Sequence, residues 1–560
     1  MLTLLHQGRP CGMLPFSSAR KTVVPADDET LLAEPGVVAP AVRTRQDLRW
    51  AIVFGAFLVS AYALGGGVAV ASQKSEYKKC AAVSRKAASD AGLTSIGSNE
   101  KLRQAQLLLL VSVPAAVAMG YALISVLRTR PRIAVKAACI WLTVVMCAIG
   151  FWNFSLGLIV NGSIFVGVAL WNAYCIYTRQ KDLELCAHLF STAAVSLREN
   201  GHLVSMSLAL CVIMCAAMIP TIYFIFAAMQ SGSAQWLYDS TYCKWNYNFL
   251  GYFTISVVGA ALAWTNATIF EMRLFITAHV ISRWYFLPAG TGLPGAPIWE
   301  ATKLCGPAFG SLCLGGLVMT AIEVIRELVD RMQRGYGPLA LLAGCFAKVI
   351  LRLMENLTRF ATIRVANTGE AFIPAARGAT ALFTSAGVRT WNCWAIPPVA
   401  LGAMSLAIAV TYGTIITIIF LTISGKAVVM AELDLAFLVW FGTTAVVFLV
   451  LSFLSSILLN VIDTLYYCYA TDNDTRRITR SEVHALFAQV PNIRPGAVVQ
   501  QPDGELGYAP STPNRVAAPV APSPSAQKAA QKESPTVQSP WQSSGKLAAT
   551  GPSTTVSPWA

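Results

Sequence analysis

Long uninterrupted apolar runs dominate the pattern of hydrophobic and polar positions along this chain. Nine of them are long enough, at about 1.5 Å per residue in a helix, to cross a hydrocarbon layer about 30 Å thick. They recur along the chain instead of clustering at its start, and the first is too long and too late for a cleaved signal peptide. We expect membrane spans at residues 50–71, 105–127, 133–153, 155–177, 203–229, 249–270, 306–325, 395–423 and 433–460.

The pattern changes between residues 326 and 394. Apolar side chains recur at helical spacing from Phe346 to Phe360, and the opposite face is charged, which is typical of an amphipathic helix on a cytoplasmic surface. That face carries Lys348, Arg352, Glu355 and Arg359. Residues 336–350, just before it, are apolar enough for a short tenth span. The sequence therefore predicts an all-α, polytopic membrane helix bundle of about ten transmembrane helices, with nine as the alternative.

Both ends of the chain read as disordered cytoplasmic tails around a transmembrane domain over residues 50–475. Residues 1–49 combine spaced prolines with mixed charge. Residues 476–560 are rich in Pro, Ser, Ala and Gln and have too little apolar surface to offset the entropy of ordering. An even number of spans would put both tails on one side of the membrane.

Composition supports the membrane assignment and argues against a nucleic-acid partner. Hydrophobic residues make up 55% of the chain and charged residues 12%, against roughly 25% charged in a soluble domain. The net charge of +14 is scattered among short loops and is not interleaved with aromatic residues in a block. Arginines beside the first two spans favour a cytoplasmic N-terminus, whereas the basic loop at 72–104 opposes it.

The cysteines give one candidate link. With the N-terminus inside, only Cys80 and Cys243 fall in outward-facing loops, where an oxidising environment permits a disulfide. Two free thiols are the alternative, because a sequence contains no distance. No cysteines or histidines occur at zinc-ligand spacing, so we predict neither a metal nor a cofactor.

Catalytic motifs do not stand out. Residues 290–295, GTGLPG, match GxGxxG, but no βαβ pattern surrounds them and Pro294 stands where a helix would begin. A membrane-embedded lipid enzyme would need a His/Asp or Cys/His pair, and His188, His202 and His279 have no convincing partner in the sequence. We therefore predict that the protein is not an enzyme.

Ionisable groups at the spans are the first functional candidates, because burying a charge in hydrocarbon costs at least a few kcal/mol. They are Glu271 after the sixth span, Glu323 late in the seventh and Asp463 at the end of the last. Each is either a substrate or proton group, or an interfacial residue near its own water.

Aromatic residues are the second group of candidates, since an aromatic face can bind a quaternary ammonium cation. Trp264 lies deep in a span beside Asn266 and before Glu271, so an aromatic ring, an amide and a carboxylate share one neighbourhood. Trp284 and Tyr285 are further candidates, although an interfacial aromatic belt would also explain them.

Glycines mark a third feature. Residues 306–316, GPAFGSLCLGG, contain the GxxxG pair Gly306 and Gly310. Such pairs let helices approach closely, and glycine-broken spans are also where transporters place substrates. Tight helix packing alone is the alternative.

Four sequence blocks stand out within residues 250–475. The first is WTNATIFEMRLFITAHVISRWYF from Trp264, and the second is GPAFGSLCLGGLVMTAIEVIR from Gly306. The third is RFATIRVANTGEAFIPAARGATALF, with Ala366, Gly369 and Phe372, and the fourth carries Asp463, Thr464, Cys468, Asp472 and Asp474. In content and order these blocks resemble the choline transporter-like family of plasma-membrane proteins, although Ala267, Glu271 and Thr368 depart from the family pattern.

The resemblance implies a transporter of choline or a related organic cation, such as ethanolamine, that works by alternating access. Membrane potential, proton exchange or both would drive it, because a monovalent cation gains about 2.3 kcal/mol on entering at −100 mV. The substrate-binding candidates are Trp264, Asn266, Glu271, Glu323, Trp284 and Tyr285. The gating or structural candidates are Gly306, Gly310, Gly369, Asn460 and Asp463.

The expected partners are a small-molecule cation and the lipid bilayer, most naturally in the plasma membrane. An organelle membrane and a homo-oligomer stay open. The alternative function is a non-transport scaffold or partner-binding protein that acts through its tails.

The length of the last span predicts where Asn460 and Asp463 lie relative to the membrane boundary. A crossing that starts at Leu433 is complete near Ser452, which places Asn460 and Asp463 at the cytoplasmic boundary. The tyrosines that follow would form an interfacial belt and residues 472–477 would be solvated. Asp463 would then make an inner-gate contact with the basic helix, at Lys348, Arg352 or Arg359.

Overall fold

The computed structural model describes most of the chain up to residue 507. The described residues are 44–72, 76–83, 99–155, 157–237, 242–287, 297–335, 338–386, 396–424, 430–475, 478–488, 499–500 and 506–507. The predictions for residues 1–43 and 508–560 as disordered tails, and the GTGLPG motif, lie outside these ranges.

Helices make up nearly all of this part. They are α1 (Leu48–Ala71), α3 (Asn99–Thr129), α4 (Pro131–Ser155), α5 (Ile159–Thr178), α6 (Gln180–Glu199), α7 (His202–Met229), α8 (Phe249–Phe286), α9 (Pro297–Gly335), α10 (Pro338–Thr368), α11 (Phe372–Ala386), α12 (Ile396–Ser424), α13 (Met430–Thr475) and α14 (Ser481–Ala488). The strands are β1 (Gly232–Leu237), β2 (Tyr242–Tyr247), β3 (Val499–Gln500) and β4 (Leu506–Gly507), which pair as two antiparallel hairpins.

Within the described residues, nine helices are long and apolar enough to cross a membrane, and they confirm the expected all-α bundle. They are α1, α3, α4, α5, α7, α8, α9, α12 and α13. The expected tenth span forms the first part of α10, which is not among the nine. Its apolar stretch runs directly into the charged amphipathic half, so one continuous helix contains both.

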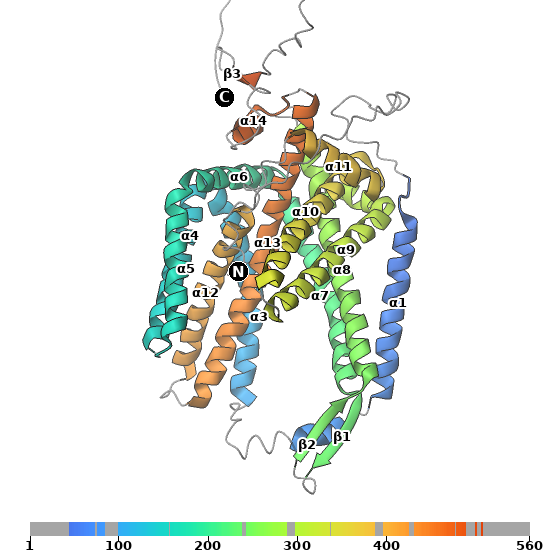
Figure 1. Cartoon of the computed structure of the whole chain (residues 1–560), viewed down its shortest axis with the longest axis vertical. Coiled ribbons are helices and arrows are strands. Elements are labelled where there is room, and N and C mark those ends of the chain that lie inside the picture. The colour runs from blue at the N-terminus through green and yellow to red at the C-terminus, as the bar shows by residue number, and fades with distance from the viewer. Residues whose placement is uncertain are drawn as a thin grey trace, which may run out of the picture. The chain divides into compact units, whose positions relative to one another are not determined.

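The described bundle has two distinct ends (Figure 1). The β1–β2 hairpin lies at one end, and α6, α11 and the end of α13 lie at the other. The start of α1 is also at this second end, and α9 and α10 pack against each other. The first long helix therefore begins, and the last long helix ends, at the same end of the bundle.

The longest described helix, α13, packs against α3, α6, α8 and α12. Its 46 residues extend about 70 Å, more than twice the hydrocarbon thickness. Its last turns are covered by protein: Tyr466, Tyr467 and Tyr469 are each 5% exposed and Asp472 is 2% exposed. The predictions of an interfacial tyrosine belt and of a solvated Asp472 were therefore wrong.

The segment after α13 explains this burial. Residues 478–488, which the sequence assigned to the disordered tail, include α14, and Phe487 packs on Tyr466 and Tyr469 with ring centroids 5.5 and 5.0 Å apart. Asp472 accepts hydrogen bonds from the Thr479 amide and hydroxyl, both at 3.0 Å, and lies 3.1 Å from His484 Nε2. The chain thus folds back over the end of α13.

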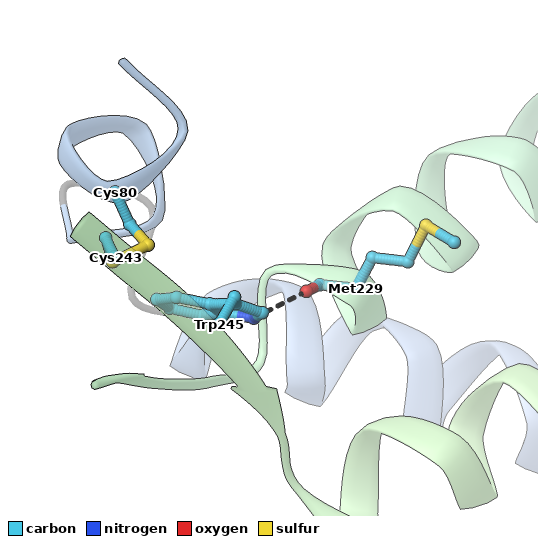
Figure 2. The surroundings of a disulfide bond; sticks show 4 residues. All are labelled: Cys80, Met229, Cys243 and Trp245. Atoms are coloured by element: carbon cyan, nitrogen blue, oxygen red, sulfur yellow. Dashed lines mark hydrogen bonds between the residues drawn. A yellow bond between two sulfur atoms is a disulfide. The ribbon is translucent and has the colours of Figure 1, made fainter. Parts of the chain in front are cut away.

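A disulfide connects two segments at the hairpin end. Cys80, in a helical stretch over residues 76–83, is bonded to Cys243 on β2, with their Cα atoms 5.4 Å apart (Figure 2). Beside it, Trp245 donates a hydrogen bond to the Met229 carbonyl at 3.1 Å. The segment after α1 is thereby attached to the hairpin that joins α7 to α8.

The Cys80–Cys243 disulfide can be tested by its effect on stability and by labelling its cysteines in intact cells. We expect Cys80→Ser or Cys243→Ser to lower the unfolding free energy by about 2–4 kcal/mol, because the cross-link restricts the unfolded chain. Thermal unfolding of the purified protein, with Cys215→Ser as the control at an exposed free thiol, measures the loss. An impermeant reductant and maleimide applied to intact cells should label both cysteines. Labelling only in inside-out vesicles would show that the hairpin end of the bundle faces the cytoplasm.

Candidate functional site

The central feature of the site is one face of α8 that lies against α9. Trp264, Thr268 and Glu271 share this face, because residues four and seven positions apart in a helix line up. Trp264 Nε1 donates to the Cys313 carbonyl of α9 at 2.9 Å. Gly315 and Gly316 of α9 lie opposite Glu271 and Thr268, so the absence of side chains there lets the two helices meet.

Trp264 belongs to an aromatic cluster built by three helices. Its ring lies 5.2 Å from Phe54, at an interplanar angle of 74°, and 5.6 Å from Phe57, both on α1. Phe309 of α9 adds a fourth ring, 6.1 Å from Phe54. Trp264 is only 5% exposed. Such a cluster can enclose an organic cation once its rings separate.

Glu271 is a buried carboxylate two turns beyond Trp264, at 3% exposure. It accepts a hydrogen bond of 2.5 Å from the Thr362 hydroxyl of α10. No cation of the described chain makes an ion pair with it within 4 Å. Its hydrogen-bond partner Thr362 is neutral, so the carboxylate has no direct counter-ion among the described residues in this conformation.

Arg359, one turn before Thr362 on α10, forms an ion pair with α13. Its guanidinium lies 3.0 Å from Glu355 and 3.6 Å from Asp463. Burial lowers the pKa of Arg359, but the charges of Asp463, Glu355 and Glu271 outweigh it and raise that pKa above its ordinary value. Arg359 therefore stays charged between α8 and α13.

Asp463 makes the expected contact with the basic helix, and it does so through Arg359. Lys348 instead pairs with Asp330 of α9 at 2.5 Å. Asp463 and Asn460 are covered by protein, with 13% of the Asp463 side chain and 7% of Asn460 exposed. Asn460 Nδ2 is buried and has no hydrogen-bond partner among the described residues. Both residues thus lie inside the bundle and do not face water at its edge.

Trp284 and Tyr285 lie elsewhere, about 20 Å further along α8 than Glu271. Arg480 lies over the Trp284 ring at 4.0 Å, and Trp284 Nε1 donates to Glu199 at 2.6 Å. Tyr285 donates to Asp472 at 2.8 Å. The structure gives both residues partners within the chain and does not bring them to Trp264.

Glu323 and Asn266 also point away from this face. The Glu323 side chain is 61% exposed and pairs with Arg326 at 2.6 Å. Asn266 follows Trp264 by two positions, which places it on another side of α8. Its Oδ1 is buried without a hydrogen-bond partner among the described residues. Of the six substrate-binding candidates, Trp264 and Glu271 share one face.

Comparison with known proteins decides the family. The sequence profile of the plasma-membrane choline transporter family matches residues 163–474, more than half of the chain. The chain belongs to this family.

Two curated relatives are distant. A CTL-like protein of Dictyostelium discoideum is 21% identical over 224 residues, which cover 38% of this chain and 38% of the relative. Protein PNS1 of Mycosarcoma maydis is 21% identical over 307 residues, covering 50% of this chain and 54% of its own length. The matched stretches therefore span about two fifths to a little over half of these relatives.

The choline transporter family match covers only part of the candidate site. Trp264, Glu271, Phe309 and Arg359 lie inside residues 163–474, whereas Phe54 and Phe57 lie in α1, before the matched range. The aromatic cluster thus joins the family region to a helix outside it.

The expected gating glycines take different roles. Gly369 has a φ of 76°, the left-handed conformation that favours glycine, and ends α10 with a 3.0 Å bond to the Val365 carbonyl. A Cβ on Gly310 would lie 2.2 Å from the Asp47 carbonyl, so close contact requires glycine there. A Cβ on Gly306 would meet nothing within 4 Å.

A hollow of about 270 Å³ lies beside the start of α1 and not around Trp264. It is lined by Arg45, Gln46, Leu48, Ala51, Gly306, Pro307, Phe309 and Gly310. Phe309 is therefore shared by the hollow and the aromatic cluster.

Several residues at or beside the site were not predicted from the sequence, among them Phe54, Phe57 and Phe309 of the aromatic cluster. Asp47 falls in the predicted tail and Thr362 is uncharged, so neither gave a signal. Arg273 could have been found, because it is a charge inside α8, but the predicted span stopped at residue 270. Arg273 is 5% exposed and donates to the Phe453 carbonyl and the Ser456 hydroxyl of α13, at 2.9 and 2.8 Å.

The contact of α8 with α9 gives a stability test with a matched control. In Gly316→Ala the new Cβ would lie 2.6 Å from Thr268 Oγ1 and 2.8 Å from the Thr268 backbone nitrogen. We expect a loss of about 1–3 kcal/mol, because α8 and α9 have to separate. Gly306→Ala should be nearly neutral. Thermal unfolding of both variants measures this, and equal melting temperatures would contradict the close helix contact.

Proposed function

We propose that this protein transports choline or a related organic cation by alternating access, with a substrate site between α1, α8 and α9. The observation that carries the proposal is the aromatic cluster around Trp264, two turns from the buried carboxylate of Glu271. Family membership supports transport, and the aromatic cluster beside a buried carboxylate supports an organic cation as the substrate.

The chemistry of the cluster suits a cation that has no N–H group to donate. A quaternary ammonium ion interacts with aromatic faces by about 0.5–2 kcal/mol per ring. Four rings could surround it: Phe54 and Phe57 from α1, Trp264 from α8 and Phe309 from α9. Glu271 would balance its charge or carry a coupling proton, since its hydrogen-bond partner Thr362 is uncharged.

The described conformation has this site closed. The rings of Phe54 and Trp264 pack directly on each other, so a cation can enter only when α1 moves relative to α8 and α9. Alternating access would open the cluster to one side at a time. The Arg359–Asp463 pair between α10 and α13 would act as an inner-gate contact.

The proposed site is smaller than the sequence suggested. It keeps Trp264 and Glu271 and leaves out Glu323, Trp284 and Tyr285, which have partners of their own in the structure. We place the protein in the plasma membrane by analogy with its family, and we assign it transport rather than catalysis.

Uptake measurements test the site directly. Trp264→Ala should raise the KM for radiolabelled choline by about 2- to 30-fold, since at least one ring contact is lost. Glu271→Gln should lower the uptake rate because the negative charge is gone. Trp152→Ala, at a Trp that is 68% exposed, is the matched control and should behave as the wild type.

Two results would count against the proposal. Unchanged uptake in both site variants, at equal surface expression, would remove this site. Absence of uptake by surface-expressed wild-type protein would remove choline as the substrate, and ethanolamine and other organic cations would then be tested.

The inner-gate role of Asp463 has its own test. Asp463→Asn weakens the pair with Arg359, so it should change the maximal uptake rate more than the KM. Asp330→Asn, which weakens the Lys348 pair between α9 and α10, is the comparison variant. A larger change in KM than in rate would instead make Asp463 a substrate ligand.

A further inference from the structure

Asp47 joins three helices at the end of the bundle opposite the disulfide. It directly precedes α1, and its Oδ2 accepts a hydrogen bond from the Ser311 hydroxyl of α9 at 2.8 Å. The same oxygen accepts one from the backbone N–H of Phe372, the first residue of α11, at 2.9 Å. One carboxylate oxygen therefore holds the start of α1 against α9 and α11.

The backbone around Asp47 also contacts α9. Asp47 has φ 53° and ψ 30°, a left-handed conformation that few residues other than glycine adopt. The Gln46 amide donates to the Pro307 carbonyl at 3.2 Å, and the Asp47 carbonyl lies where a Cβ of Gly310 would be. Both the side chain of Asp47 and the main chain around it thus hold the start of α1 against α9.

This junction lies next to the aromatic cluster. Phe54 is two turns beyond Asp47 on α1, and Phe309 directly precedes Gly310 on α9. A rigid-body movement of α1 that separates Asp47 from Ser311 would also draw Phe54 away from Phe309 and Trp264. The 270 Å³ hollow between Arg45 and Gly310 leaves space on this side of the rings.

We propose that Asp47 is a positioning residue that latches the inner side of the substrate site, and that breaking its bonds to Ser311 and Phe372 opens the aromatic cluster toward the cytoplasm. This inference rests on the proposed transport site, and its test needs no transported substrate.

Cys313 reports the opening. Its thiol is free and fully buried at 0% exposure, and its carbonyl accepts the Trp264 bond. Inside-out vesicles are treated with an impermeant maleimide, and labelled peptides are quantified by mass spectrometry. Asp47→Ala should speed labelling of Cys313 at least about tenfold, because two hydrogen bonds to a charged group are lost.

Three controls keep the result decisive. Asp47→Asn should stay within about threefold of the wild type, since a single amide oxygen can accept both bonds. Ser311→Ala, which removes one of them, should fall between. Cys468, also a free thiol at 0% exposure, should stay unlabelled. Labelling of Cys468 in Asp47→Ala would indicate that this variant unfolds, and the latch would then be judged from Ser311→Ala.

Wild-type labelling of Cys313 in Asp47→Ala, or in Ser311→Ala where the first variant unfolds, would overturn the latch. Labelling that responds as expected in a protein that takes up no choline or other organic cation would instead retain the latch and overturn the proposed function.

Discussion

Charged side chains inside a membrane-spanning helix must find partners in neighbouring helices, because hydrocarbon offers none. Helix α8 contains two such charged side chains, Glu271 and Arg273, only two positions apart. Glu271 is bonded to Thr362 of α10, and Arg273 is bonded to Phe453 and Ser456 of α13. Residues two positions apart project to different sides of a helix. These two charges therefore fix α8 between α10 and α13, and with it the orientation of Trp264.

The span pattern and part of the site could be predicted from the sequence. Continuous apolar runs locate the nine spans, because length and hydropathy are local properties. Trp264 and Glu271 were found together because seven residues make nearly two turns, so one helix brings them to the same face. The resemblance to the choline transporter family rests on blocks that the 163–474 match contains.

Tertiary contacts account for what the sequence did not reveal. Nothing local to Tyr466 or Asp472 indicates that residues 478–488 fold back and cover them. Asp47 looked like part of a polar tail, and its role appears only with α9 and α11 beside it. Trp284 illustrates the reverse error: an aromatic face suited to a cation is present, but Arg480 of the same chain lies on it at 4.0 Å.

The disulfide has a mechanical consequence for the site. By attaching the segment after α1 to the hairpin between α7 and α8, it tethers the end of α1 to the start of α8. The 24 residues of α1 form a lever about 36 Å long. A tilt of about 10° around that anchor would move the other end by about 6 Å, the width of an aromatic ring with its contacts. Because the covalent bond limits separation at one face of the membrane, larger displacements of α1 would occur at the opposite face.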